Sequence, residues 1–192
     1  IRMDYGISDW EGVKNILLTG ERDNFCVLRK SYRNTVEIAN FASDILAHGE
    51  FPGYGAEPVI RHGEAVGIRQ TAGKDLYREA AKICKGWQTE GFDTIAVICR
   101  DQKQAQETAE LLQKELPVMP WDPEKASFEK GIMVFPVEYT KGLEFDAVLL
   151  LSPDRESYPT DDGHAKLLYV AATRALHRLE VLHTGNLTGL IA

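Results

Sequence analysis

The chain has 192 residues, of which 44% are hydrophobic, and carries a formal net charge of −7 at pH 7. A chain of this length can bury about 70% of its unfolded surface, so one globular domain without stabilising disulfides or metals is expected. The acidic balance argues against a free-standing, non-specific nucleic-acid binder, which would need a basic surface.

The cysteines and the hydropathy indicate the kind of compartment in which the protein works. There are three cysteines, an odd number, and none forms a CxxC pair, so a disulfide framework or zinc ribbon is disfavoured. A reducing, cytoplasmic location is expected. No apolar run reaches the ~18 residues of a membrane span, so no membrane association is expected. The chain starts at Ile1 and stops after Ala192, which we interpret as a piece of a longer protein.

Taken in chain order, periodicity and turn residues predict the following elements of the first half. They are a short helix over 10–18, a buried strand over 25–28, a helix capped by Asn34 or Thr35 that runs to about Leu46, a loop over 49–58, and short strands over 59–61 and 66–70.

The second half continues with an alternation of helices and strands. It predicts a helix from about Lys74 to Gly91, a strand over 94–99, a helix that ends at Pro117, strands over 132–137 and 147–151, a helix over 167–176 and a final strand over 179–182. Most of these strands are apolar throughout, which is typical of a parallel sheet covered on both faces. Ligands of such sheets usually bind at the carboxyl ends of the strands, so polar segments that follow strands are the first candidates for chemistry.

Several common catalytic motifs are absent from the sequence. The stretch 67–75 has five residues between its glycines and Asp75 after Lys74, whereas a P-loop has four residues and a Ser or Thr. A turn that opens a helix explains this stretch better. There is no GxSxG or HExxH, and the five histidines show no ligand spacing, so neither a metal site nor a self-contained hydrolase is predicted.

Three polar segments stand out together. They are Leu-Arg-Lys-Ser-Tyr-Arg-Asn-Thr at 28–35, Tyr-Thr-Lys-Gly-Leu-Glu-Phe-Asp at 139–146 and Leu-Tyr-Val-Ala-Ala-Thr-Arg-Ala at 168–175. In order and spacing they resemble the motifs of the second, C-terminal RecA-like motor domain of UvrD/Rep-type helicases. A weaker likeness covers the strand and helix that begin at Ile95, and the whole resemblance spans residues 25–184.

The resemblance implies the fold and the domain organisation. The fold is α/β, a RecA-like P-loop NTPase fold with a mainly parallel sheet and helices on both faces, and this second motor domain lacks its own P-loop. Residues 1–22 would be the end of a preceding motor domain or a linker, and residues 23–192 the second RecA-like domain. The implied ligand is ATP with Mg²⁺, held mainly by the first RecA-like domain of the same protein.

The resemblance also implies roles for individual residues. Arg33 and Arg174 match the two arginines that contact the phosphates, and such an arginine finger accelerates phosphoryl transfer by on the order of 10³–10⁵. Tyr32 matches the aromatic residue that stacks on adenine, and Glu144 the carboxylate that binds the ribose hydroxyl. The alternatives are surface ion pairs for the arginines, half-buried packing for Tyr32, and capping of a helical turn after Gly142 for Glu144.

The second segment, 139–146, also contains residues that are expected to lie close to a ligand. Gly142 is a candidate nucleotide contact, and Thr140 and Lys141 are candidate nucleic-acid contacts. Glycine allows the backbone to pass close to a phosphate, although a tight turn is an equally simple explanation. Arg174 is expected on a helix, exposed and off its apolar stripe, so that truncation would cost under about 0.5 kcal/mol of stability.

Two features depart from typical DNA-translocating members. Glu138 stands three residues before the motif lysine, where those members carry a histidine that contacts the strand. Only the fifteen residues 117–131 stand where the family inserts a large accessory domain. Both features resemble the HelD branch, whose ATPases bind and recycle RNA polymerase. The implied partners are therefore the first motor domain, DNA and RNA polymerase. The alternative is a catalytically inert RecA-like module that docks a protein partner.

Overall fold

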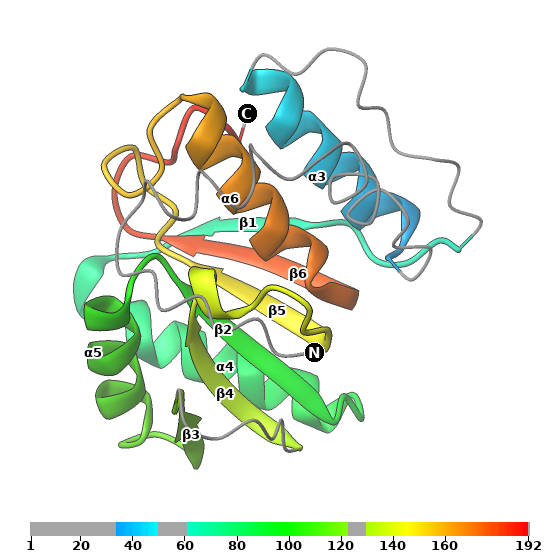
Figure 1. Ribbon diagram of the computed structural model, residues 1–192. Coiled ribbons are helices and arrows are strands. Elements are labelled where there is room, and N and C mark those ends of the chain that lie inside the picture. The colour runs from blue at the N-terminus through cyan, green and yellow to red at the C-terminus, as the bar shows by residue number, and fades with distance from the viewer. Residues whose placement is uncertain (1–33, 50–60, 123–129, 192) are drawn as a thin grey trace.

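In the computed structural model, residues 34–49, 61–122 and 130–191 are described, and within them the chain forms a six-stranded sheet. Its strand order is β1-β6-β5-β2-β4-β3, and every neighbouring pair is parallel. The strands are β1 (Gly67–Gln70), β2 (Thr94–Cys99), β3 (Val118–Pro120), β4 (Gly131–Pro136), β5 (Phe145–Leu151) and β6 (Ala175–His183). The predicted parallel α/β architecture is confirmed (Figure 1).

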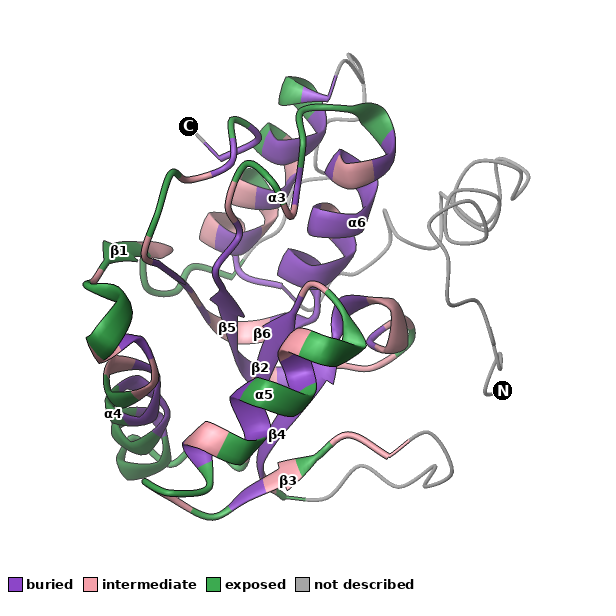
Figure 2. Cartoon of the chain, turned by 90° about the vertical axis from the view of Figure 1, so that its left-hand side faces the viewer, coloured by how far each residue is buried: buried purple, intermediate pink, exposed green. Residues whose placement is uncertain are grey.

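Helices cover both faces of the sheet. Helices α3 (Val36–His48) and α6 (Asp162–Thr173) pack on one face, and α4 (Leu76–Thr89) and α5 (Gln102–Leu112) pack on the other. Successive side chains of a strand point to opposite faces, so the apolar run of β2 supplies Ala96 and Ile98 to the first face and Val97 to the second. Figure 2 shows the central strands as buried between the two helical layers.

The helix ends follow from local polar residues. Thr35, one of the two predicted caps, accepts a hydrogen bond from the Ile38 amide through its hydroxyl oxygen. Asp101 and Asp161 cap α5 and α6 by accepting from the amides of Gln104 and His164. Gly91 follows α4 with a φ of +97°, a backbone conformation that favours glycine.

Several predicted boundaries differ from the observed ones, most of all those of α5, of α6 and of the last strand, β6, which begins at Ala175 rather than at Leu179. Helix α5 ends at Leu112 because residues 113–116 form turns that lead into β3, a strand that the sequence did not predict. Helix α6 begins earlier than predicted, after the Asp161 cap, and ends at Thr173. The backbone then joins β6 immediately, since Phe145 of β5 pairs with Ala175.

The stretch 67–75 forms no phosphate-binding loop. Residues Gly67–Gln70 are β1, and a single 3-10 turn, η1 (Gly73–Asp75), leads directly into α4. This is the helix-opening turn that the spacing of its glycines predicts. The domain therefore has no P-loop at this position.

The segment between β4 and β5 matters most for the site. It starts with the 3-10 turn η2 (Val137–Tyr139), which packs against α6, and continues to the first residue of β5. Because β4 and β5 are parallel, this segment must return from the carboxyl end of the sheet, where these strands end, to the amino end, where they begin. At the amino end the Phe145 amide donates to the carbonyl of Arg174 at 2.8 Å.

Some predictions lie outside the described residues. These are the helix over 10–18, the strand over 25–28, the domain boundary at residue 22, most of the loop over 49–58, and residues 59 and 60 of the predicted strand 59–61. Arg61, the last residue of that strand, is described and lies in no strand. No helix in the described ranges is long and apolar enough to cross a membrane.

Candidate nucleotide site at the amino end of the sheet

Arg174 lies at the junction of α6 and β6, as the C-cap of the helix rather than within it. Its relative exposure is 7%, so the prediction of an exposed arginine on a helix face is wrong. The physical reason is that α6 ends at Thr173, one residue before Arg174. The side chain then folds back over the last helical turn instead of projecting into solvent.

The guanidinium of Arg174 is held by acceptors from two segments. Its Nε donates to the carbonyl of Val170 at 3.0 Å and its Nη1 to the carbonyl of Leu143 at 3.2 Å. Its Nη2 donates to the hydroxyl of Thr173 at 3.2 Å. Three of the five guanidinium N–H groups thus have acceptors among the described residues, which leaves one N–H on each terminal nitrogen for a ligand.

The acceptors that hold Arg174 are neutral carbonyls and a hydroxyl, so they fix its position without removing its charge. Burial lowers the pKa of Arg174, while the neighbouring charges of Glu144 and Tyr169 act in the opposite direction. An arginine stays protonated under these conditions. Its place at the carboxyl-terminal end of α6 is favourable for a cation, because the helix dipole is negative there.

Lys141 and Gly142 form a tight turn next to this arginine. The Leu143 amide donates to the Thr140 carbonyl at 3.0 Å, and Gly142 has a φ of +80°. A Cβ atom at Gly142 would meet nothing within 4 Å, so the residue is required for its backbone conformation and leaves open space around it. The alternative of a tight turn is therefore correct for the backbone, and it still permits a close ligand contact.

Lys141 adds a second cation to the same place. Burial lowers the pKa of Lys141, and the nearby charge of Arg174 lowers it further. The charge of Glu144 raises the pKa of Arg174 against the effect of burial, which places this carboxylate near the guanidinium. Strand β5 begins at Phe145, directly after Glu144, so Glu144 lies between the turn at Gly142 and the sheet.

Thr140 does not face outward with these residues. It is fully buried, and its hydroxyl donates to the carbonyl of Val137 at 2.7 Å, which closes the 3-10 turn η2. In this structure its side chain cannot contact a nucleic acid, contrary to the prediction. The predicted residues Tyr32 and Arg33 lie outside the described residues.

The structure thus brings Lys141, Gly142, Glu144 and Arg174 together, and it does so at the amino end of the sheet. Glu144 precedes β5 and Arg174 precedes β6. These residues therefore precede strands, whereas the sequence-based expectation for a parallel sheet placed the candidates for chemistry after strands.

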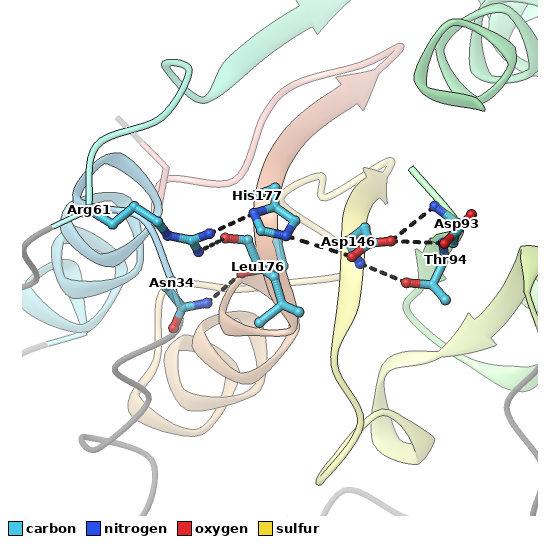
Figure 3. A network of polar contacts seen from close by, with 8 residues as sticks. Asn34, Arg61, Asp93, Thr94, Asp146, Leu176 and His177 are labelled. Atoms are coloured by element: carbon cyan, nitrogen blue, oxygen red, sulfur yellow. Dashed lines mark hydrogen bonds and ion pairs between the residues drawn. The ribbon is translucent and has the colours of Figure 1, made fainter. Parts of the chain in front are cut away.

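A belt of polar contacts fixes the same end of the sheet (Figure 3). Asp146 at the start of β5 accepts from the amides of Asp93 and Thr94 at 3.0 and 3.1 Å. Its other carboxylate oxygen lies 3.7 Å from Nε2 of His177 on β6. Adjacent strands are thereby tied together where the candidate site lies. Within the described ranges, no group of three or more His, Cys, Asp or Glu side chains could hold a metal ion.

Two anchors of this site were missed from the sequence. The carbonyl of Leu143 holds Arg174, and the side chain of Asn34 bonds to the backbone on both sides of Arg174. A carbonyl carries no sequence signal. Asn34 did carry a sequence signal, because it stands directly after Arg33 in the first motif. It was interpreted only as a possible helix cap.

Comparison with known proteins supports the same interpretation of these segments. The family model of the UvrD-like helicase C-terminal domain matches residues 131–182, the region from β4 to β6 that contains Lys141, Glu144 and Arg174. The predicted resemblance to UvrD-like helicases is confirmed.

A likeness to a solved structure covers most of the chain. It is the C-terminal domain of a possible DNA helicase from Lactobacillus plantarum, with 26% sequence identity and a TM-score of 0.69. The alignment covers 84% of this chain and 92% of that one. No curated protein sequence matches this chain. The fold is therefore that of a helicase C-terminal domain.

Proposed function

We propose that this chain is the second motor domain of an ATP-dependent, UvrD-like DNA helicase or translocase, and that Arg174 is its arginine finger. The observation that carries the proposal is the way Arg174 is held. Two backbone carbonyls and a hydroxyl fix its guanidinium while its charge stays unpaired by any hydrogen-bonded carboxylate in the described residues. A preorganised cation of this kind stabilises charge that develops on a transferring phosphoryl group.

The neighbouring residues fit a polyphosphate. Arg174 and Lys141 are both partly desolvated and each raises the positive potential at the other. An anion placed beside them relieves this repulsion, because it favours the charged form of both. ATP is the anion that the family resemblance implies, and its triphosphate would meet both cations when a first motor domain brings it to the amino end of this sheet.

The remaining nucleotide contacts follow from the motif matches. Glu144 would accept a hydrogen bond from the ribose, Gly142 would allow the turn to approach the nucleotide, and Tyr32 and Arg33 would contribute adenine stacking and a second phosphate contact. The described residues provide no carboxylate cluster for Mg²⁺. The metal ion would therefore be held by the first RecA-like domain.

For the partner, we propose the HelD-type role in which the ATPase binds and recycles RNA polymerase. Glu138 supports it. Burial raises the pKa of Glu138, and the charge of Arg100 acts in the opposite direction. A carboxylate at this position opposes the phosphate backbone of a DNA strand and also neutralises a nearby cation that a strand could have used. Of the two predicted nucleic-acid contacts, Lys141 would then be the one left to meet DNA, since Thr140 is buried.

Steady-state ATPase measurements on the full-length protein test the arginine finger. Arg174→Ala should lower turnover by on the order of 10²-fold or more, and Arg174→Lys should recover little because an ammonium cannot reproduce the planar fork. Arg178→Ala is the matched control, since Arg178 lies on β6 and pairs with Glu90 at 2.7 Å. If Arg174→Ala keeps more than about half of the activity, Arg174 is not the finger.

The isolated chain provides a second test. Because it lacks a P-loop, it should show no ATPase activity of its own. Activity of the purified chain that disappears on Arg174→Ala would contradict the proposal of a site shared between two domains.

Stimulation experiments separate the partners. ATPase activity of the full-length protein is measured with single-stranded DNA and, separately, with RNA polymerase. The HelD-type role predicts stimulation by the polymerase, and a translocase role predicts stimulation by DNA. An ATPase rate of zero under every condition would favour the inert docking module instead.

A further inference from the structure

The side chain of Asn34 lies against the backbone that carries Arg174. Its Nδ2 donates to the carbonyl of Thr173 at 3.1 Å and to the carbonyl of Ala175 at 2.5 Å. These partners are 139 and 141 residues away in the sequence, and they are the immediate neighbours of Arg174 on either side. Asn34 is only 3% exposed.

Among side chains of the size of Asn34, only the amide can make both contacts as they stand. Both partners are carbonyl oxygens, which accept, so the group between them must provide two N–H donors from one atom. A hydroxyl provides one donor and a carboxylate provides none. The orientation of the Asn34 amide is therefore fixed by its partners.

These bonds complete the support of the α6–β6 junction. On the other side of the same junction, the carbonyl of Arg174 accepts from the Phe145 amide. Three successive carbonyls, from Thr173 to Ala175, are thus all held by residues outside α6 and β6. The backbone from which the Arg174 side chain starts is thereby held on both sides, and the bonds to the carbonyls of Val170 and Leu143 direct its guanidinium from there.

A second contact joins the same two regions. Arg61, whose carbonyl accepts from the Val36 amide at the start of α3, donates through its guanidinium to the carbonyl of Leu176 at 2.6 Å. The same guanidinium lies 2.7 Å from Nδ1 of His177, which must accept because a guanidinium only donates. Figure 3 shows Asn34 and Arg61 side by side at the start of β6.

We propose that Asn34 is a positioning residue that sets the direction of the Arg174 side chain. This inference rests on the proposed role of Arg174 as the finger. Asn34 directly follows Arg33, so one side chain links the segment of the first motif to the junction that carries the last one. A shift of the backbone in the first motif would therefore move the backbone of Arg174 through the two hydrogen bonds of Asn34.

The test compares variants of the full-length protein by kcat and KM for ATP. Asn34→Asp keeps the shape of the side chain but turns a carboxylate toward two carbonyls, and Asn34→Ser keeps one donor. Asn40→Asp is the matched control, because it makes the same chemical change at an exposed position of α3. Asn34→Asp should lower kcat about tenfold or more with KM within about threefold, Asn34→Ser should lie between it and wild type, and Asn40→Asp should match wild type.

A double variant distinguishes positioning from simple stabilisation. If Asn34 acts through Arg174, then adding Asn34→Asp to Arg174→Ala should change kcat by less than about twofold. All rates are measured below the melting transition of each variant. A kcat loss that multiplies in the double variant, or an unchanged kcat in a folded Asn34→Asp protein, would overturn the inference.

The outcomes also separate this inference from the proposed function. If Arg174→Ala keeps its activity, the finger itself is wrong. If Arg174→Ala is inactive while Asn34→Asp is as active as wild type, only the positioning role is wrong. Should Asn34→Asp fail to fold, Asn34→Ser in both backgrounds decides the question by the same criteria.

Discussion

Each end of the sheet carries an arginine, buried at the amino end and half-buried at the carboxyl end, and the two arginines are held in different ways. At the amino end, Arg174 donates to two carbonyls and a hydroxyl and lies next to a second cation. At the carboxyl end, Arg100 donates from Nε to the carbonyl of Ser157 at 2.9 Å and lies 5.7 Å from the ring centre of Tyr158. Arg100 also has the charge of Glu138 nearby.

The difference shows which arginine is prepared for a ligand. Arg100 has an aromatic ring beneath it and a carboxylate beside it, so its charge is already compensated within the domain. Arg174 is held by neutral acceptors, and the charges of Glu144 and Lys141 near it act in opposite directions. The position of each arginine relative to the strands does not show which one binds a ligand. Ligands of parallel sheets usually bind at the carboxyl ends of the strands, where Arg100 lies.

The largest effect that tests this comparison is on stability. Arg174→Ala leaves the carbonyl of Leu143 without the donor that Arg174 provides and leaves the carbonyl of Val170 with only the Thr173 hydroxyl, so we expect it to lower the free energy of unfolding of this chain by about 2 kcal/mol. This replaces the sequence-based expectation of under about 0.5 kcal/mol, which assumed exposure. Arg100→Ala should cost about 1 kcal/mol.

Urea unfolding of the chain measures both values. The control is Arg78→Ala, because Arg78 is exposed and pairs only with Asp75 one turn away. Such pairs contribute less than about 1 kcal/mol. If Arg174→Ala unfolds as Arg78→Ala does, the anchoring of Arg174 by carbonyls is not a real feature of the folded protein.

The next largest effect is on ATP turnover, where a variant at the amino end of the sheet should be impaired and a variant at the carboxyl end should not. In the full-length protein, Lys141→Ala should lower kcat/KM for ATP about tenfold, equivalent to about 1.4 kcal/mol, because the second cation beside Arg174 is lost. Arg100→Ala should stay within about twofold of wild type. The measurement is the ATP dependence of the ATPase rate at fixed DNA concentration.

The same Lys141 variant decides between its two candidate ligands. If Lys141 contacts nucleic acid rather than nucleotide, the KM for ATP stays unchanged and the concentration of DNA that gives half-maximal stimulation rises instead. A loss with Arg100→Ala as large as that with Lys141→Ala would remove the distinction between the two ends.

Much of the fold was predictable from the sequence, because its elements are specified locally. The strand 94–99 was predicted with the observed bounds, since an apolar run ended by Gly91 and by the cap Asp101 leaves little freedom. Thr35 was one of two predicted caps and is the one observed. The parallel arrangement followed from strands that are apolar on both faces.

The geometry of the site was less predictable because it depends on distant contacts. Helical periodicity carried the predicted helix past Arg174, but pairing of Phe145 with Ala175 ends the helix at Thr173 and starts β6. That pairing joins residues 30 positions apart, which no local window contains. The burial of Arg174 and the double hydrogen bond from Asn34 both follow from it.

The two ends also differ in their glutamates. At the start of α3, near the amino end, Glu37 accepts from the Gly63 amide at 2.8 Å and lies 3.0 Å from Nδ1 of His62. These hydrogen bonds lower the pKa of Glu37 to about 2. At the carboxyl end, burial raises the pKa of Glu138. One carboxylate is stabilised in its charged form and the other is not.

The smallest expected effect is the opposite pH dependence that these two glutamates give to stability. Glu37 has a folded-state pKa below its ordinary value of 4.5, so its contribution is present above about pH 4.5 and is lost as the pH falls toward 2. Glu138 has a folded-state pKa above 4.5, so its ionisation lowers stability as the pH rises through that higher value.

Urea unfolding between pH 3 and 7 should therefore show that Glu37→Gln is less stable than wild type at pH 7, with a gap that narrows toward pH 3. Glu138→Gln should be as stable as wild type at pH 3 and more stable at pH 7. Parallel curves for wild type and both variants would contradict the assigned environments, because a group that titrates alike in the folded and unfolded states contributes no pH dependence.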